Sequence, residues 1–306
     1  MVDLICPVIS TTREEDDRKV IDHVVAGGRG ANMVFILGHT GEFSYVGHQS
    51  KLEKIHVARQ EILRQRQMHN LGPKALSLAV GITGKDMDET IELAQHAENN
   101  GADYLVFMPI FPTLNNGGKF SRRCGKQIRS LLEHTFDTPI MFYNNPHVTG
   151  GKNIRTDLFK EFAEDPRIVA LKDSSGVLER LKNYRRAANE NAKVYVGDEI
   201  LGLRSPGDGI VAGSANILPL GWSRGIRTDW DEDIFSGAVR DELIKIQQVY
   251  TENPIGAFHY ILEKQGVINF MGPYNQTNSA SQDLRNSLDN LMGEERFQTM
   301  FKASTR

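Results

Sequence analysis

The strongest constraint on the fold is an alternation of short apolar runs with amphipathic stretches. Eight runs can be marked, at Leu4–Ile9, Met33–Leu37, Ala75–Val80, Tyr104–Met108, Pro139–Tyr143, Ile168–Lys172, Lys193–Gly197 and Gly209–Gly213. The first six intervals between run starts span 25 to 42 residues, enough for a strand, a helix and two loops, and the last spans 16. Strands that alternate with helices predict a parallel sheet. Eight of them favour a (β/α)8 barrel, an α/β fold, over an open doubly wound sheet.

The stretches between the runs carry helix signals. One helix opens with the acids of Asp86–Glu89 and closes at Asn99–Gly101, and others are expected near Glu14–Ala26, Lys51–Met68, Ser121–His134, Ile154–Ala163 and Val177–Asn189. After Pro219 only helices are expected, at Asp233–Tyr250, Pro254–Lys264 and Ser281–Met292. We predict a barrel domain over residues 1–225 and a C-terminal helical region over residues 226–306 packed on it.

The charge balance disfavours two classes of partner. Lys and Arg number 36 against 39 Asp and Glu, so the formal net charge is -3 and there is no basic field to attract nucleic acid or anionic lipid. No apolar run approaches the roughly 20 residues of a membrane span, and the N-terminal sequence MVDLICPVIS shows no targeting signal. We expect a soluble, cytoplasmic protein.

Motifs for common cofactors are missing from the sequence. No Gly-Lys pair precedes Ser or Thr as in a P-loop, and the glycines of Gly27–Gly30 precede a strand, which argues against a dinucleotide site. There is no His-Glu-x-x-His, and Cys6 and Cys124 suit neither a disulfide framework nor a thiolate zinc site. We expect no metal site, and two reduced, buried cysteines.

Lys172 stands where such a barrel carries its chemistry. Reactive groups gather at the C-terminal ends of barrel strands, and Lys172 follows the apolar run Ile168–Leu171. An amine in a poorly solvated barrel mouth loses its proton more readily and can attack a ketone. The resulting iminium allows a neighbouring carbon–carbon bond to break or form. The plain alternative is a lysine paired with Asp173 or extended into solvent.

Two further features end predicted strands. Tyr143 can donate and accept the protons that imine chemistry requires, or can be a core tyrosine with a satisfied hydroxyl. The loop Gly38–Gly41 can hold a carboxylate through its backbone N–H groups and the Thr40 hydroxyl, or can be an ordinary turn.

Four motifs in register carry a resemblance to a known family. Their order and spacing are similar to those of the dihydrodipicolinate synthase and N-acetylneuraminate lyase family, over nearly the whole chain: Gly38-His39-Thr40-Gly41-Glu42, Tyr143-Asn144-Asn145-Pro146-His147-Val148-Thr149-Gly150, Leu171-Lys172-Asp173-Ser174-Ser175-Gly176 and Gly209-Ile210-Val211-Ala212-Gly213-Ser214-Ala215-Asn216. The resemblance implies a class I aldolase barrel, usually a homotetramer. It also implies a Schiff base between the family lysine and pyruvate or another 2-oxo acid, without a metal.

The resemblance assigns roles residue by residue. Lys172 matches the Schiff-base lysine, Tyr143 the proton-shuttling tyrosine, Thr40 the threonine that binds the 2-oxo acid carboxylate, and Val211 the aliphatic residue of the pyruvate site. Asp198 and Glu199 resemble the acidic pair that holds sugar hydroxyls in sialic acid lyases, and Ser174 matches a hydroxyl-bearing position after their lysine. Gly41 and Gly197, which flank these residues, are also expected to border the substrate.

The chain departs from the family pattern at four positions. His39 stands where a Thr or Ser usually relays protons, and Phe111 where a second tyrosine from a neighbouring subunit commonly completes the relay. Either His39 acts as the third catalytic residue, or the relay is shortened to Tyr143 and water. Val148 replaces the arginine that binds aspartate semialdehyde, and Gly213 replaces a serine of sialic acid lyases.

These matches lead to a leading expectation and several open alternatives. We expect a homo-oligomeric aldolase, tetramer or dimer, that makes or cleaves a hydroxylated 2-oxo acid, such as a 2-keto-3-deoxy sugar acid, with pyruvate and an aldehyde as partners. A 4-hydroxy-tetrahydrodipicolinate synthase and a 2-oxo acid dehydratase are alternatives. So is an aromatic hydratase-aldolase, for which Ile110, Phe111 and Val148 leave room. A barrel that binds a 2-oxo acid without turnover is the non-enzyme alternative.

Overall fold

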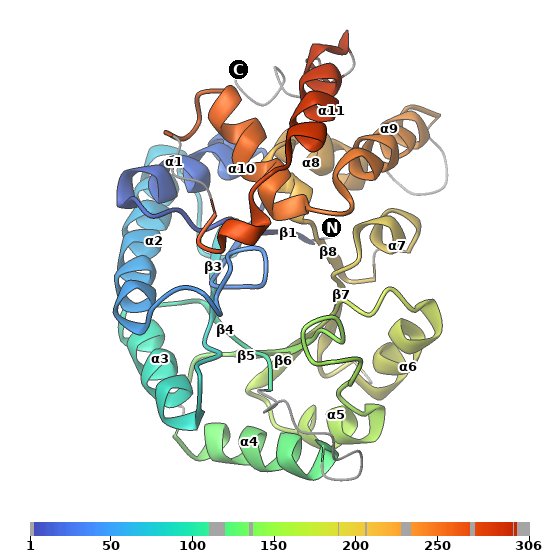
Figure 1. Cartoon of the computed structure of the whole chain (residues 1–306). Helices are drawn as coiled ribbons and strands as arrows, with labels where there is room; N and C mark the ends of the chain where they lie inside the picture. Colours follow the sequence, from blue (N-terminus) through green and yellow to red (C-terminus); the bar gives the residue numbers. More distant parts are fainter. Residues whose placement is uncertain are drawn as a thin grey trace.

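Eight parallel strands close into a barrel in the structure, a computed structural model that describes residues 3–109, 120–134, 137–188, 190–205, 207–227, 234–269, 273–295 and 297–298. Each strand pairs with its neighbours in the sequence, and β8 closes on β1 (Figure 1). The strands are β1 (Asp3–Pro7), β2 (Met33–Ile36), β3 (Ser77–Gly81), β4 (Tyr104–Phe107), β5 (Ile140–Asn144), β6 (Ile168–Asp173), β7 (Lys193–Val196) and β8 (Gly209–Val211). The eight predicted strands are confirmed, each bound lying within about two residues of the prediction.

Helices cover the outside of the barrel and explain why the strand runs are continuously apolar. They are α1 (Glu14–Val25), α2 (His48–Met68), α3 (Met87–Asn99), α4 (Phe120–His134), α5 (Thr156–Phe162), α6 (Leu178–Ala188), α7 (Glu199–Arg204) and α8 (Pro219–Arg227). Strands with a helix on one face and the barrel interior on the other are buried on both faces. Val34, Leu78 and Val80 are accordingly fully buried. The expected start of α3 is confirmed, because the Asp86 carboxylate accepts a hydrogen bond from the Glu89 backbone N–H at 2.9 Å.

Two of these helices were not predicted from the sequence. The short interval before β8 holds α7, a helix of six residues whose first turn is capped by Asp198. The sequence of α8 contains Gly221 and Gly225, and glycine lowers helix propensity by about 1 kcal/mol relative to alanine.

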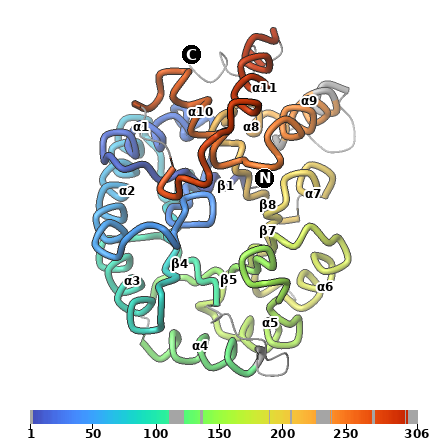
Figure 2. Tube along the Cα trace, viewed as in Figure 1, coloured from blue at the N-terminus to red at the C-terminus, as the bar shows by residue number. Residues whose placement is uncertain are grey.

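Three helices follow the barrel: α9 (Ile234–Tyr250), α10 (Pro254–Lys264) and α11 (Gln282–Gly293). These bounds confirm the predicted helices to within about one residue. Figures 1 and 2 show the three at one side of the barrel, next to α8 and α1, and the chain between α10 and α11 passes over the adjacent part of the barrel mouth. The division into residues 1–225 and 226–306 stays a prediction.

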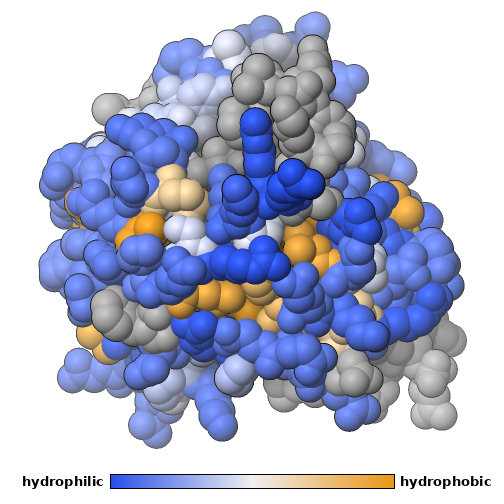
Figure 3. Space-filling view, turned by 90° about the horizontal axis from the view of Figure 1, so that it is seen from below, coloured by the Kyte–Doolittle hydropathy of each residue, from blue (hydrophilic) through white to orange (hydrophobic). Residues whose placement is uncertain are grey.

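The surface is largely hydrophilic on the side where α4 and α5 lie. Figure 3, which views the molecule from that side, shows a hydrophilic face crossed by an apolar band. Among the described helices, none is long and apolar enough to cross a bilayer. Cys6 and Cys124 are both buried and unbonded to each other, as expected.

Candidate active site

A cavity of about 690 Å³ opens at the C-terminal ends of the strands and gathers most of the predicted site residues. Nine of the ten line it, namely His39, Thr40, Tyr143, Lys172, Ser174, Gly197, Asp198, Glu199 and Val211. Gly41 does not line it and is buried in its loop, where an added Cβ would lie 3.1 Å from both the Ser10 Oγ and the Val8 carbonyl oxygen. Its role is therefore to let the loop pack closely against β1.

Lys172 and Tyr143 form the floor of the cavity. They are register partners on β6 and β5, and their exposed fractions are 4% and 5%. The Lys172 Nζ lies 4.0 Å from the centroid of the Tyr143 ring and 5.2 Å from that of Phe35. The Lys172 amine therefore lies close to two aromatic rings at the barrel mouth.

The plain alternative for Lys172 fails in this arrangement. The Asp173 carboxylate accepts hydrogen bonds from the Asn144 Nδ2 at 2.8 Å and the Ser175 Oγ at 2.8 Å. Among the described residues, no carboxylate forms an ion pair with Lys172, and its side chain does not reach solvent. The amine is thus held in the cavity without a carboxylate partner in the described part of the chain.

Gly197, at the end of β7, makes room for the lysine. A Cβ at this position would lie 2.8 Å from the Lys172 Cε and 2.2 Å from the Ser174 Oγ. Both distances are shorter than real Cβ contacts allow, so a larger residue at this position would displace the Lys172 and Ser174 side chains.

The Tyr143 hydroxyl has a partner that the sequence did not predict. The Asn145 Nδ2 donates a hydrogen bond to the phenolic oxygen at 2.8 Å, and Asn145 lines the same cavity. The sequence could have indicated this partner, because Asn145 stands two residues after Tyr143 and residues i and i+2 of an extended strand point to the same side.

His39 lines the cavity at an exposed position of its loop. Loss of water around its imidazole, and then the positive charges of Lys172 and His147, lower the pKa of His39. In the described part of the chain no hydrogen bond joins His39 to the Tyr143 hydroxyl. Its catalytic role stays a prediction.

The acidic pair after β7 is fixed by local hydrogen bonds. The Asp198 Oδ1 accepts from the Leu201 backbone N–H at 2.8 Å, and its Oδ2 accepts no hydrogen bond from the described residues. The Glu199 carboxylate accepts from the Ser214 backbone N–H at 2.9 Å and from the Ser214 hydroxyl. Burial raises the pKa of Glu199. Asp198 therefore has the freer carboxylate oxygen for a ligand.

Glu42, quoted in the first motif but given no role, fastens the Thr40 loop. Its side chain is 2% exposed, and its carboxylate accepts hydrogen bonds from the backbone N–H groups of Tyr274 at 2.7 Å and Asn275 at 3.0 Å. The Asn278 Nδ2 donates to the same carboxylate at 2.8 Å. The segment that follows α10 is thus held against the loop that carries Thr40.

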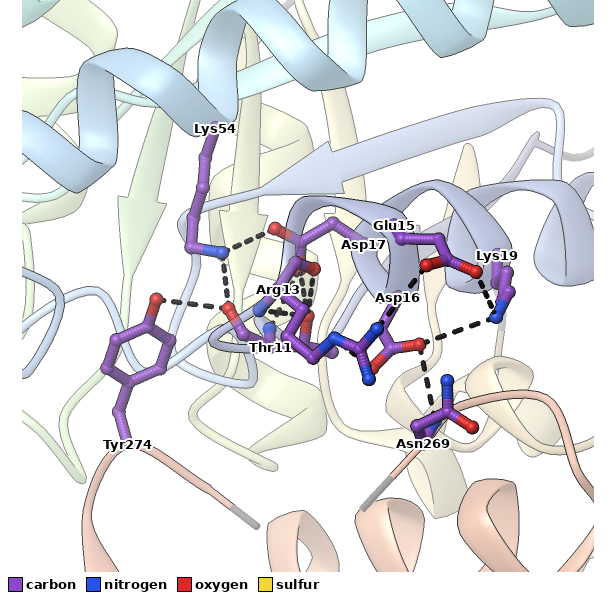
Figure 4. A network of polar contacts seen from close by, with 9 residues as sticks. All are labelled: Thr11, Arg13, Glu15, Asp16, Asp17, Lys19, Lys54, Asn269 and Tyr274. Atoms are coloured by element: carbon purple, nitrogen blue, oxygen red, sulfur yellow. Dashed lines mark hydrogen bonds and ion pairs between the residues drawn. The ribbon is translucent and has the colours of Figure 1, made fainter. Parts of the chain in front are cut away.

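A second network ties the same segment to the loop after β1 (Figure 4). The Tyr274 hydroxyl donates to the Thr11 carbonyl oxygen at 3.0 Å, and the Lys54 ammonium donates to the same oxygen at 2.6 Å and to the Asp17 carboxylate. Burial raises the pKa of Asp17. Charged hydrogen bonds of this kind fix backbone position, so the outer wall of the cavity is well anchored.

The outer wall of the cavity combines polar side chains with the apolar Pro254, Ile255 and Phe258 of α10. The ends of α9 and α10 and the short 3-10 helix Gln276–Asn278 contribute Gln247, Thr251, Glu252, Asn253, Asn275, Thr277 and Asn278. Lys172 is the one Lys or Arg side chain among the described residues that line the cavity. The wall therefore offers hydrogen-bonding groups and negative charge to a bound molecule.

Of the three apolar residues that left room for an aromatic aldehyde, only Val148 is among the described residues, and it does not line this cavity. Val148 lines a neighbouring cavity of about 470 Å³ together with Phe43 and Met108. Ile110 and Phe111 lie outside the described residues, so the expected replacement of a relay tyrosine by Phe111 stays a prediction. Among the described residues, no group of three or more His, Cys, Asp or Glu side chains is placed to hold a metal ion.

Comparisons with known proteins agree with this barrel and its loops. The model of the dihydrodipicolinate synthetase family matches residues 10–269. A 4-hydroxy-tetrahydrodipicolinate synthase of Thermosipho africanus is 28% identical over 195 residues, which cover 62% of this chain and 61% of that enzyme. A 2-dehydro-3-deoxy-D-gluconate/2-dehydro-3-deoxy-phosphogluconate aldolase of Thermoproteus tenax is 29% identical over 226 residues, which cover 71% of this chain and 66% of that enzyme. The chain thus spans a little under two thirds of the length of these relatives.

The fold also matches solved structures over almost the whole chain. A prophage protein of the dihydrodipicolinic acid synthase family from E. coli K12, solved in complex with pyruvate, superposes with a TM-score of 0.80. The match covers 97% of this chain and 99% of that one at 21% identity. At this identity the likeness concerns the fold.

Proposed function

Because this chain belongs to the dihydrodipicolinate synthetase family, we propose that it is a class I aldolase whose Lys172 forms a Schiff base with a 2-oxo acid. The observation that carries the proposal is the buried Lys172 amine, which forms no ion pair with the described residues and lies 4.0 Å from the centroid of the Tyr143 ring in the cavity at the barrel mouth. A lysine amine is a nucleophile for carbonyl carbons, and its iminium draws electrons from the adjacent carbon.

In the cleavage direction, the Lys172 nitrogen adds to the C2 keto carbon of the substrate, and water leaves to give the iminium. Tyr143 removes the C4 hydroxyl proton, the C3–C4 bond breaks, and its electron pair moves to the iminium nitrogen to leave an enamine. The aldehyde departs, the enamine takes a proton at C3, and water releases pyruvate from Lys172. Thr40 binds the carboxylate, and Val211, Gly197 and Ser174 border the pyruvate half. The lysine supplies the electron sink, so this sequence of steps uses no cofactor.

The cavity wall favours an uncharged, hydroxylated distal half of the substrate. Asp198, Glu199 and Glu252 are acidic, and amides and hydroxyls make up much of the remaining wall. Pro254, Ile255 and Phe258 add an apolar part. Carboxylates accept hydrogen bonds from sugar hydroxyls but repel a second carboxylate or a phosphate. We therefore propose a 2-keto-3-deoxy sugar acid without a phosphate group as substrate, rather than aspartate semialdehyde.

The proposal includes a cytoplasmic homo-oligomer, tetramer or dimer. Two unpaired cysteines are usual in a reducing compartment. The adjacent apolar side chains of Val177 and Leu178 at the start of α6 are 45% and 41% exposed, which suits a contact between subunits. The assembly is measured by sedimentation or light scattering of the purified chain.

Borohydride reduction in the presence of pyruvate tests the proposed chemistry. The expected product is a chain heavier by pyruvic acid less one oxygen atom, with the addition on Lys172 in peptide mapping. Lys172→Met removes the adduct, whereas Lys182→Met, which changes an exposed lysine of α6, leaves it intact. A wild-type chain that forms no adduct overturns the proposal.

A panel of substrates tests the proposed preference of the cavity wall for an uncharged, hydroxylated distal half. We expect pyruvate release from a 2-keto-3-deoxy sugar acid to exceed release from its phosphorylated form. Condensation of pyruvate with aspartate semialdehyde as the sole activity would overturn the substrate assignment while leaving the Schiff base intact.

A further inference from the structure

The Tyr143 hydroxyl has a hydrogen-bond partner two residues further along the chain. In the described part of the chain, Asn145 is the residue whose side chain hydrogen-bonds the Tyr143 hydroxyl, with 2.8 Å between its Nδ2 and the phenolic oxygen. An amide N–H that donates to this oxygen occupies one of its lone pairs, so the phenol's own proton must point away from Asn145. The contact thus sets the direction in which Tyr143 can give or take a proton.

The Oδ1 end of the same amide has no hydrogen-bond partner among the residues that the structure describes. Asn145 is 3% exposed, and its Oδ1 accepts no hydrogen bond from the described residues. A buried amide oxygen without a donor destabilises a fold, and most such atoms in native proteins are satisfied. Asn145 lines the cavity, so a bound ligand is a source of the missing donor, although the Oδ1 atom is covered in this structure and its neighbours must shift to admit the donor.

The adjacent Asn144 has a purely structural role and serves as a comparison for Asn145. The Asn144 Nδ2 donates to the carboxylate of Asp173 at 2.8 Å and to the Asn153 Oδ1 at 3.0 Å, and its Oδ1 accepts from the Ile154 backbone N–H at 2.9 Å. Asn144 is therefore fully used within the fold. Asn145 uses one end for Tyr143 and leaves the other for the cavity.

We infer that Asn145 is a further catalytic residue, which directs Tyr143 through its Nδ2 and binds the leaving hydroxyl of the substrate through its Oδ1. This inference rests on the proposed function. When Lys172 has added to the keto group, the C2 carbon carries a hydroxyl that must leave as water. The Tyr143 proton moves to that oxygen, the C2–O bond breaks, and the nitrogen lone pair of Lys172 forms the C=N bond.

Asn145 stabilises this step at both ends and exchanges no proton. The hydrogen that the C2 hydroxyl already carries is donated to the Asn145 Oδ1, which holds the departing water. The Asn145 N–H then faces a phenolate, and a donor to an anionic oxygen favours the charged form. The same contact serves the reverse step, in which water adds to the iminium and pyruvate is released.

The test is the rate at which pyruvate becomes trapped on Lys172 by borohydride, measured from pH 6 to pH 10 in wild type and two variants. Asn145→Ala removes both contacts, and Asn145→Asp keeps the size and the acceptor but replaces the donor by a negative charge. We expect both to slow trapping about ten- to a hundredfold at pH 7.5 and to move the alkaline limb of the profile to higher pH.

Asn153→Ala, in the same loop but outside the cavity lining, is the matched control and should trap at the wild-type rate. Thermal unfolding and circular dichroism report whether each variant is folded, and the near-isosteric Asn145→Asp decides the question if Asn145→Ala is not. Wild-type rates and an unmoved alkaline limb in the folded variants would overturn the role of Asn145 while leaving the Schiff base in place. Absence of trapping in the wild type itself refutes the proposed function instead.

Discussion

The Glu42 carboxylate accepts a hydrogen bond of 2.7 Å from the backbone N–H of Tyr274, although the two residues lie 232 positions apart in the chain. Glu42 follows the loop that carries His39 and Thr40, and Tyr274 precedes Asn275, Thr277 and Asn278 of the outer wall. The contact therefore couples the part of the cavity that would bind the 2-oxo acid carboxylate to the part that would bind the distal half.

Glu42→Gln should loosen both parts of the cavity together. The variant keeps one acceptor oxygen but turns an amide NH2 group toward backbone N–H donors. Because hydrogen bonds to a charged group are worth about 1.5–3 kcal/mol, we expect the free energy of unfolding to fall by about 2 kcal/mol. The KM for the 2-oxo acid should rise with it, as measured by urea unfolding and steady-state kinetics. Glu53→Gln, an exposed carboxylate of α2, serves as control, and unchanged KM with lowered stability would limit Glu42 to a structural role.

Gly197→Ala should slow imine formation without unfolding the chain. The new Cβ would fall 2.8 Å from the Lys172 Cε and 2.2 Å from the Ser174 Oγ, so the lysine side chain must move. A displacement of about 1 Å at a reacting group costs about a hundredfold in rate, and we expect pyruvate trapping to slow at least that much. Gly72→Ala, where an added Cβ meets nothing within 4 Å, is the matched control. Wild-type trapping by Gly197→Ala would show that the lysine reaches the substrate by another path.

Periodicity was sufficient to predict most of the fold. Continuous apolar runs mark the strands because both of their faces are buried, and the amphipathic stretches mark the covering helices. The short α7 was not predicted because six residues show too little periodicity. The helix α8 was not predicted because Gly221 and Gly225 interrupt the helical pattern.

The candidate site was predictable only as far as strand ends determine it. Lys172 and Tyr143 end neighbouring strands, so a barrel places them together whatever the loops do. The partners of Asn145 and Glu42 depend on where side chains and a distant segment come to lie. A contact such as the one between Glu42 and Tyr274 joins residues far apart in the chain and cannot be predicted from local sequence, so these roles required coordinates.

Stability should depend on pH through His259 of α10. Burial lowers the pKa of His259 to about 4, and its Nε2 has no hydrogen-bond partner in the described residues. The unfolded chain binds a proton at this residue near pH 6.5, and the folded chain binds it only near pH 4. The folded state is therefore not penalised by this residue at pH 7, and it loses stability relative to the unfolded state as the pH falls from about 6.5 to about 4. We expect this residue to account for about 2 kcal/mol of the difference in unfolding free energy between pH 7 and pH 5. In urea unfolding, the difference between the free energies at pH 7 and pH 5 should be smaller in His259→Gln than in wild type by this amount. His134→Gln, at an exposed site, should keep the wild-type difference.

Asp198→Asn separates recognition of the distal hydroxyls from chemistry at Lys172. Asparagine caps helices about as well as aspartate, so α7 should keep its first turn, while the Asp198 Oδ2, which accepts no hydrogen bond within the described residues, loses its charge. We expect the KM for a hydroxylated 2-oxo acid to rise about tenfold, since a hydrogen bond to a charged acceptor is worth more than one to a neutral acceptor. Pyruvate has no distal hydroxyls, so its rate of borohydride trapping should stay at the wild-type value. Asp88→Asn, at an exposed position of α3, is the control for removal of one negative charge. An equal loss in pyruvate trapping would place Asp198 at the imine rather than at the distal hydroxyls, and an unchanged KM would remove it from substrate recognition.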